Sequence, residues 1–220
     1  MTEPQLTGPS FGPASGNPPK QLVVLLHGRG ANGNDLIGLA PMLAEHLPDA
    51  LFLAPDAPDP CEGAPFGLQW FSLTDRSPEN IAAGVRGVAP AIDAFLDHHL
   101  ARHGLSDGDL AMFGFSQGCM MALHIGMRRA AAPAAVLGYS GLLAAADSLA
   151  DEITARPPVL LVHGEADEIV PHAVLAAAET TLRDAGVPVE AVSRPGLGHG
   201  IDDDGVARAI ALLDRVFTDG

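Results

Sequence analysis

Short runs of apolar residues recur along the chain at strand length, and stretches of helical periodicity separate them. Unbroken apolar runs are typical of strands that are covered on both faces, as in a parallel sheet. Strand and helix alternate throughout, with no internal repeat and no second zone of composition. This alternation predicts one α/β domain with a mostly parallel central sheet and helices on both faces. The expected strands are residues 21–26, 50–54, 110–114, 134–140, 158–164 and 189–193.

The segments between these runs carry apolar residues at every third or fourth position, which predicts amphipathic helices. In residues 78–102, Ser77 is a candidate N-cap, and Pro90 is expected to kink or split the helix. Residues 117–130 are apolar on nearly every side, so we expect a central, buried helix there. The other expected helices are residues 34–46, 171–185 and 202–217.

The first 20 residues are rich in Pro, Gly and Ser, unlike the rest of the chain. We expect residues 1–20 to form an N-terminal arm, with at most an edge strand or hairpin around Gln5 to Pro9. Residues 21–220 are then a single domain, long enough to bury a substantial core. The stretch between the runs at 134–140 and 158–164 is too short for a large cap domain.

The formal net charge of -15 argues against nucleic acid and anionic membrane surfaces as partners, because both demand basic patches. No apolar run approaches the roughly 20 residues of a membrane span, and no secretory signal is visible. Cys61 and Cys119 are too few for a disulfide framework in a chain of 220 residues. Reduced thiols in a cytoplasmic protein are therefore expected.

The segment GFSQG, residues 114–118, follows an expected strand and precedes an expected apolar helix. A Gly-x-Ser-x-Gly pattern in that context is typical of a nucleophile elbow, a sharp turn that projects the serine at the start of the helix. The helix dipole and free N–H groups favour a negatively charged oxygen there. Without the context, the pattern would indicate only a serine N-cap in a glycine-rich turn. The context favours Ser116 as a nucleophile.

A serine hydroxyl is a weak nucleophile at neutral pH and needs a base, which in turn needs an acid to orient it. In this class of fold the three occur in the order serine, acid, histidine. The segment HGEADEIVP, residues 163–171, follows an expected strand and holds three acids. We expect Asp167 to be the acid, because it lies far enough past the strand to turn back across the sheet edge. On spacing alone, Glu165 and Glu168 remain alternatives.

Nine histidines compete for the role of base. His199 stands apart, in the glycine-rich segment PGLGHGID after the last expected strand and before the last expected helix. A histidine in such a loop can reach back over the sheet toward Ser116. Most of the others lie within or at the ends of expected helices and strands, namely His46, His98, His99, His103, His124, His163 and His172.

The segment LLHGRGAN, residues 25–32, stands at the carboxyl end of the first strong strand. Gly28 and Gly30 let its backbone turn sharply and aim an N–H group at the serine. An oxyanion hole in this fold takes one N–H from that loop and one from the residue after the nucleophile, here Gln117. A phosphate-binding loop is excluded, because no Lys-Ser/Thr pair follows the glycines.

Five motifs in this order resemble the phospholipase/carboxylesterase family, the α/β-hydrolases similar to acyl-protein thioesterases. They are LLHGRGANGND, QWFSLTDRSPENI, GFSQG, HGEADEIVP and GLGHGI, and the resemblance runs from about Gln21 to the C-terminus. It implies an α/β-hydrolase fold with Ser116 as nucleophile, Asp167 as acid and His199 as base. It also implies oxyanion donors at the backbone N–H groups of Arg29 and Gln117.

The resemblance further implies that a loop holding Leu68, Trp70 and Phe71 lines the acyl pocket. An aromatic cluster in a loop is as often part of a satellite core as a binding wall. One departure concerns Arg29, where family members often carry a small apolar residue. Its side chain can reach for an anionic leaving group or point to water, and the sequence leaves both open.

Together these features predict a serine carboxylesterase that hydrolyses short- to medium-chain carboxylic esters or thioesters through an acyl-enzyme intermediate. Acyl-protein thioesterase or lysophospholipase activity is the alternative, and the missing cap argues against a peptidase or true lipase. A catalytically silent binding protein of this fold would lack one of the triad positions, and here all are filled. No cofactor or metal is expected. The expected partner is a small-molecule substrate; dimers are common in such families, but the sequence carries no interface signature.

Overall fold

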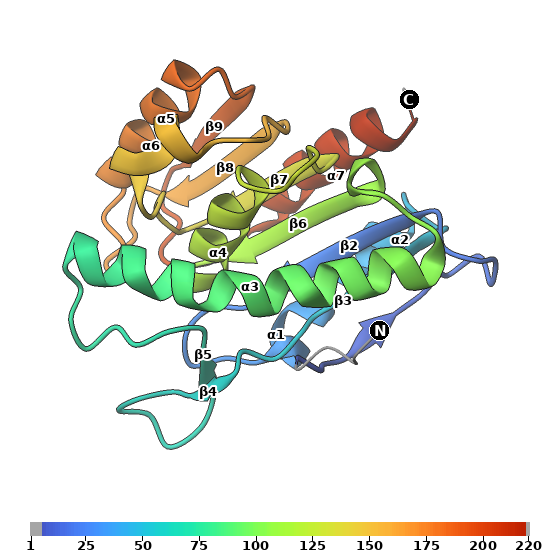
Figure 1. Ribbon diagram of the computed structural model, residues 1–220, viewed down its shortest axis with the longest axis horizontal. Coiled ribbons are helices and arrows are strands. Elements are labelled where there is room, and N and C mark those ends of the chain that lie inside the picture. Colours follow the sequence, from blue (N-terminus) through green and yellow to red (C-terminus); the bar gives the residue numbers. More distant parts are fainter. Residues whose placement is uncertain (1–5, 219–220) are drawn as a thin grey trace.

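The computed structural model describes residues 6–218, and a seven-stranded sheet runs through its centre (Figure 1). The strand order is β1-β3-β2-β6-β7-β8-β9, and every neighbouring pair is parallel except β1 with β3. A separate two-stranded ribbon joins β4 to β5. The strands are β1 (Ser10–Phe11), β2 (Gln21–Leu26), β3 (Ala50–Leu53), β4 (Asp59–Pro60), β5 (Leu68–Gln69), β6 (Leu110–Phe115), β7 (Ala135–Tyr139), β8 (Val159–Gly164) and β9 (Val189–Arg194).

Each of the six apolar runs forms a strand of this sheet, at nearly the expected bounds. Strands β3, β7 and β8 are buried at every position, which explains why their sequences show unbroken apolar runs rather than alternation. The register pairs Leu26 with Gly114 and Phe115 with Tyr139, so the carboxyl ends of β2, β6 and β7 meet at one edge. The expected mostly parallel α/β sheet is confirmed.

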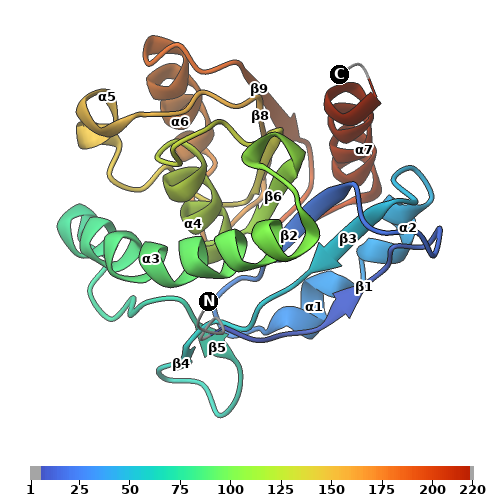
Figure 2. The same cartoon turned by 45° about the vertical axis from the view of Figure 1, so that its right-hand side comes forward.

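Helices cover both faces of the sheet, as Figure 2 shows. One buried core lies between the sheet and α3, α4 and α6, and a second lies between the sheet and α1, α2 and α7. The side chains of β2 alternate between them, with Val24 in the first core and Val23 in the second. The helices are α1 (Gly33–Ile37), α2 (Ala40–Ala44), α3 (Pro78–His103), α4 (Gln117–Gly126), α5 (Leu149–Glu152), α6 (Ala173–Asp184) and α7 (Asp203–Thr218), with 3₁₀ turns η1 (Asp107–Asp109) and η2 (Ala146–Ser148).

The single helix expected over residues 34–46 is wrong, because α1 ends at Ile37 and α2 begins at Ala40. Gly38 lowers helix propensity, and Pro41 lacks the N–H that would continue the hydrogen-bond ladder from α1. Pro41 instead occupies the first turn of α2, where its missing N–H costs nothing. Periodicity alone therefore joined two short helices into one.

Of the kink or split expected at Pro90, the split is not found, because helix α3 continues through the proline. Both Pro90 and Arg86 are exposed, so the Arg86 carbonyl that loses its partner faces water, which can hydrogen-bond it. Buried side chains along the opposite face hold the helix together across the proline. They are Ile81, Val85, Ala89, Ile92, Phe95, Leu96 and Leu100.

The N-terminal arm contributes an edge strand, β1, slightly later than the sequence suggested. Ser10 and Phe11 pair antiparallel with β3, and Leu6 is buried at 4% exposure. Gln5, where the strand was expected to begin, lies outside the described residues. The arm therefore covers the edge of β3 within the part of the chain that is described. The boundary between an arm at 1–20 and a domain at 21–220 stays a prediction.

Between β7 and β8 the chain forms only η2 and the short helix α5. No large cap domain is inserted there, as expected. Among residues 6–218, no helix combines the length and apolarity that crossing a bilayer would require.

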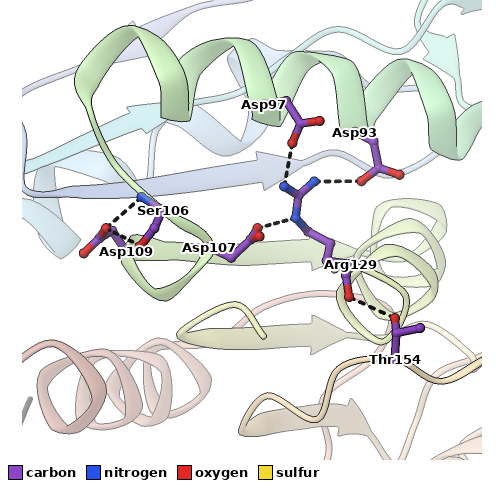
Figure 3. Close-up of polar contacts among 7 residues, drawn as sticks. All are labelled: Asp93, Asp97, Ser106, Asp107, Asp109, Arg129 and Thr154. Carbon is purple, nitrogen blue, oxygen red and sulfur yellow. Dashed lines mark hydrogen bonds and ion pairs between the residues drawn. The ribbon is translucent and has the colours of Figure 1, made fainter. Parts of the chain in front are cut away.

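The turn after α4 is tied to α3 by the guanidinium of Arg129 (Figure 3). Nη1 of Arg129 lies 2.9 Å from Asp93 Oδ1, and Nη2 lies 2.6 Å from Asp97 Oδ1, both on α3. Nε donates to Asp107 in η1, and the Arg129 carbonyl accepts from Thr154 Oγ1 at 2.9 Å. The Arg129 side chain is only 8% exposed, so these carboxylates replace water around the cation. The network thus braces the C-terminal end of α4 against α3.

Replacing Arg129 with methionine is expected to lower the free energy of unfolding by about 2–4 kcal/mol, because it leaves the half-buried Asp107 without a counter-charge. Arg183→Met is the matched control, since Arg183 forms its ion pair with Glu179 on the exposed surface of α6 and also donates to the Val189 carbonyl at 3.4 Å. Arg183→Met should lower the free energy of unfolding by less than about 1 kcal/mol. Urea unfolding followed by circular dichroism measures both. Equal losses in the two variants would contradict a bracing role for Arg129.

Candidate active site

Ser116 sits in a sharp turn between β6, which ends at Phe115, and α4, which begins at Gln117. Its backbone adopts φ 54° and ψ -114°, a region that residues with a Cβ rarely occupy. Such a conformation costs on the order of 1–3 kcal/mol and persists only where neighbouring structure holds it. Here the Ser116 N–H donates to the Tyr139 carbonyl at 2.8 Å, and the wholly buried α4 follows directly. The strand, the strained serine and the helix together form the expected elbow.

Gly114 and Gly118 are required by the close packing of this elbow. A Cβ on Gly114 would overlap the carbonyl of Gly118, and a Cβ on Gly118 would overlap the carbonyl of Leu26 on β2. Neither glycine has a positive φ, so space rather than backbone conformation demands them here. Their absent side chains let the first turn of α4 approach β2 and bring Ser116 close to the loop after β2.

His199 lies in the loop between β9 and α7, and its ring reaches Ser116. Nε2 of His199 is 3.0 Å from Ser116 Oγ, and Nδ1 is 2.8 Å from Asp167 Oδ2. The Phe115 ring packs beside the imidazole, with ring centroids 4.9 Å apart. The sequence-predicted serine, acid and histidine are therefore brought together from three loops at the carboxyl edge of the sheet.

The Asp167 side chain is fully buried in the loop after β8. Its Oδ1 accepts the N–H groups of Ile169 and Val170, each at 2.9 Å. Burial alone would raise the pKa of Asp167, but these N–H groups and the His199 ring outweigh burial and lower it. Glu165 and Glu168 are exposed, so of the three acids in this loop only Asp167 reaches His199.

These contacts determine which nitrogen of His199 carries hydrogen. The ionised Asp167 carboxylate can only accept, so Nδ1 of His199 is the donor. Nε2 is then left with a lone pair that can accept the Ser116 hydroxyl hydrogen. This is the arrangement that a general base for the serine needs.

His163 is a further member of the site that the sequence argument did not single out. Its Nε2 lies 2.9 Å from the Val170 carbonyl and 3.2 Å from Asp167 Oδ2, and its side chain is 1% exposed. Because a carbonyl oxygen only accepts, Nε2 carries the hydrogen and donates it to the Val170 carbonyl. This bond anchors the loop of Asp167 and keeps the buried His163 ring beside the carboxylate. In the sequence, His163 stands near the end of a strand, four residues before Asp167, and this spacing was the available signal for their contact.

The loop after β2 passes beside Ser116 and is held by hydrogen bonds to β5 and to the residue that follows it. The Trp70 indole N–H donates to the His27 carbonyl at 2.8 Å, and the Gly30 N–H donates to the Leu68 carbonyl at 2.7 Å. The Gln117 side chain accepts the Trp70 backbone N–H at 2.9 Å, which ties this loop region to α4.

Two backbone N–H groups of this region are free to act as donors. Among the described residues, no acceptor is found for the N–H of Arg29, and Gln117 stands at the first position of α4, where no intrahelical acceptor exists. These are the two donors that the sequence assigns to an oxyanion hole.

A pocket of about 350 Å³ opens beside Ser116 and His199. Its walls are mostly apolar and come from the segment before α3, the first turns of α3 and α4, and the loops after β7 and β8, at the left of Figure 1. The side chains of Arg29 and Arg76 complete them. The apolar lining residues are Leu73, Ile81, Met120, Leu142, Ile169, Val170 and Pro171.

The expectation that Leu68, Trp70 and Phe71 line this pocket is corrected. Trp70 is fully buried and Phe71 is 5% exposed, and neither they nor Leu68 are among the lining residues. The indole packs on the His27 ring, with centroids 5.2 Å apart. These residues support the loop after β2 from the core side, which is the satellite-core role.

Arg29 is exposed, and its guanidinium also hydrogen-bonds to the protein. Its Nε donates to Gln69 Oε1 at 3.3 Å, and its Nη2 donates to the Glu62 carbonyl. Both acceptors are neutral, so they fix the guanidinium without neutralising it. Separately, the described residues contain no cluster of three or more His, Cys, Asp or Glu side chains that could hold a metal ion.

Comparison with known proteins identifies relatives along nearly the whole chain. The family model described as phospholipase/carboxylesterase matches residues 13–216. The crystal structure of esterase PE8 superposes with a TM-score of 0.92 at 41% identity, covering 96% of this chain and 99% of that one. Esterase YpfH of Escherichia coli K12 is 29% identical over 196 residues, 89% of this chain and 83% of that protein. Acyl-protein thioesterase 1 of Yarrowia lipolytica is 25% identical over 158 residues, 67% and 70% of the two chains.

Proposed function

Since this chain belongs to the phospholipase/carboxylesterase family of α/β-hydrolases, we propose that it hydrolyses carboxylic esters or thioesters by a serine mechanism. In this proposal Ser116 is the nucleophile, His199 the base and Asp167 the orienting acid. One observation carries it: Ser116 Oγ, both nitrogens of His199 and Asp167 Oδ2 form an unbroken relay at 3.0 and 2.8 Å.

The proposed acylation begins when Ser116 Oγ attacks the acyl carbon and its proton passes to Nε2 of His199. The Asp167 carboxylate stabilises the imidazolium that forms. The carbonyl oxygen becomes an oxyanion and accepts hydrogen bonds from the N–H groups of Arg29 and Gln117. His199 then gives its proton to the leaving alcohol or thiol, and the acyl group remains on Ser116.

Deacylation repeats these steps with water as the nucleophile. Nε2 of His199 takes a proton from the water as its oxygen attacks the acyl-enzyme. The same N–H groups hold the second oxyanion, and His199 returns the proton to Ser116 Oγ as the carboxylic acid leaves. The water that attacks supplies the proton that His199 returns to Ser116, so the protons balance.

A pocket of about 350 Å³ with mostly apolar walls supports short- to medium-chain substrates. Ile169 at its rim is 62% exposed, and no cap domain covers it. One relative is named as an esterase and another as an acyl-protein thioesterase. These names support substrates with either an alcohol or a thiol leaving group. Thioesterase or lysophospholipase activity is the alternative within this proposal. Cys61 and Cys119 are free, in keeping with the cytoplasmic location that we propose.

The proposal is tested by reaction with a fluorophosphonate probe, since only an activated serine reacts quickly with it. We expect one adduct per chain, mapped by peptide mass spectrometry to Ser116 and not to Ser140. Ser140 is a suitable internal control, because it also has a positive φ, 47°, at a strand end but lacks a histidine base. A chain that is folded but unlabelled would instead support a silent binding protein. Ester and peptide panels run side by side separate an esterase from a peptidase.

His163→Leu is expected to lower kcat by about 10- to 100-fold with little change in KM, because Asp167 and His199 lose their fixed geometry. His163→Gln should recover part of the loss, since its amide can still donate to the Val170 carbonyl. The rate of fluorophosphonate labelling should follow kcat in both variants. A normal labelling rate in a folded His163→Leu variant would show that His163 does not position Asp167.

A further inference from the structure

The pocket beside Ser116 carries positive charge in a strongly acidic protein. The chain has 27 Asp and Glu residues against 12 Lys and Arg, yet none of the described residues that line this pocket is an Asp or Glu. Two arginines, Arg29 and Arg76, are among the lining residues. Positive charge in the pocket raises the local concentration of anions. The low polarity of the pocket walls strengthens this attraction.

Arg76 is the freer of the two arginines. It is exposed, and among the described residues it makes no hydrogen bond or ion pair. It directly precedes Ser77, the N-cap of α3, and Ile81 in the first turns of that helix also lines the pocket. The positive end of a 26-residue helix therefore lies beside the same wall.

Arg29 is held in place by neutral groups, so its charge remains available. Its acceptors are the Gln69 side-chain oxygen and the Glu62 carbonyl, and Gln69 is 2% exposed. A buried, fixed acceptor pre-orients the guanidinium and lowers the entropy lost when it binds an anion. Arg29 is thus a rigid cation at the mouth of the site.

Two acids close to these arginines, Asp75 and Glu62, accept hydrogen bonds from neutral groups. The Asp75 carboxylate accepts the Ser77 N–H at 2.8 Å and the Asn80 amide. The Glu62 carboxylate accepts the Ser72 hydroxyl at 2.6 Å. Neither acid forms an ion pair with Arg29 or Arg76.

We propose that this pocket selects esters that carry anionic oxygens, a carboxylate or a phosphate, on the part of the substrate that faces Arg29 and Arg76. The inference rests on the proposed esterase function and narrows it to a substrate class. A guanidinium suits such groups because its planar fork matches two anionic oxygens. The apolar walls then hold the rest of the acyl or alcohol portion.

The experiment compares matched esters that differ only in charge. For the acyl side, mono-p-nitrophenyl glutarate is compared with the same ester whose free carboxylate is capped as a methyl ester. For the alcohol side, phenyl acetates with a para carboxylate or para phosphate are compared with the neutral para acetamide. The ratio of kcat/KM for the anionic and the neutral partner is measured in each arm, at low and at high salt.

Arg76→Gln is expected to lower the ratio of kcat/KM for the favoured anionic esters over their neutral partners by about tenfold. Arg102→Gln is the matched control. It removes the same charge from the opposite end of α3, a helix of 26 residues that is about 39 Å long at 1.5 Å per residue. Added salt should reduce the preference of the wild-type protein, because the charges are partly exposed to solvent.

Three outcomes decide the matter. A preference for anionic esters that falls in Arg76→Gln and persists in Arg102→Gln supports the inference, and the responding arm identifies where the charge lies. If Arg76→Gln does not change the ratio of kcat/KM for anionic and neutral esters, the inference is overturned and the esterase function stands. A protein that neither hydrolyses any ester nor reacts with the fluorophosphonate probe overturns the proposed function itself.

Discussion

Ser116→Ala is expected to lower kcat for ester hydrolysis by about 10⁴-fold or more, the scale seen when a member of a catalytic triad is lost. The substitution removes only Oγ, so the pocket and the oxyanion donors remain and a small residual rate is expected. Serine and alanine both carry a Cβ, so the substitution adds no strain to the backbone at φ 54°. The fold should therefore be kept. Initial rates with p-nitrophenyl esters measure the loss, and thermal unfolding checks the fold.

The matched control is Ser106→Ala. Ser106 precedes β6 at its opposite end and contacts Asp109 rather than the site. It should retain the rate of the unchanged protein. A Ser116→Ala variant that keeps a substantial share of the wild-type kcat would show that another group attacks the ester, and the serine mechanism would be abandoned.

Asp167→Asn is expected to lower kcat by about 10⁴-fold, although it is nearly isosteric. The three groups that hydrogen-bond the carboxylate are all donors: the N–H groups of Ile169 and Val170, and the ring of His199. An amide has only one oxygen. If that oxygen takes the two backbone donors, the amide NH₂ faces the histidines and forces Nδ1 of His199 to accept.

His199 then carries its hydrogen on Nε2, which points at Ser116 and can no longer take the serine proton. Slow fluorophosphonate labelling should accompany the fall in kcat. Glu168→Gln, in the same loop, removes the same charge from an exposed acid and should leave kcat and the labelling rate unchanged. An Asp167→Asn variant with near-normal kcat would remove Asp167 from the mechanism and reopen the choice among the acids of this loop.

The layered arrangement of this protein could be predicted from its sequence, because strands covered on both faces must be apolar throughout. The runs that became β2, β3, β6, β7, β8 and β9 were all visible in this way. Errors arose where a local pattern admits two answers. One apolar stripe over residues 34–46 covers α1 and α2, and Pro90 is tolerated in α3 because its side of the helix faces water.

The members of the candidate relay could be singled out from local sequence alone. A serine between two glycines after a strand, an acid after a later strand and a histidine in a glycine-rich loop each occupy the carboxyl edge of the sheet. In a parallel sheet these ends lie together, so order along the chain predicts proximity in space. The choice of Asp167 over Glu165 and Glu168 was made on spacing, and the burial of Asp167 beside His199 agrees with it.

What surrounds the relay was decided only by the tertiary structure. Trp70 packs beneath the loop after β2, the pocket wall comes instead from residues such as Ile81 and Met120, and Arg29 rests on Gln69, forty positions away. His163, at the end of β8, lies 3.2 Å from the Asp167 carboxylate, a contact that its position in the sequence does not reveal. Apolar periodicity reports only whether a side chain is buried. Which neighbours it meets depends on how distant segments cross, and that is determined when the helices and loops pack.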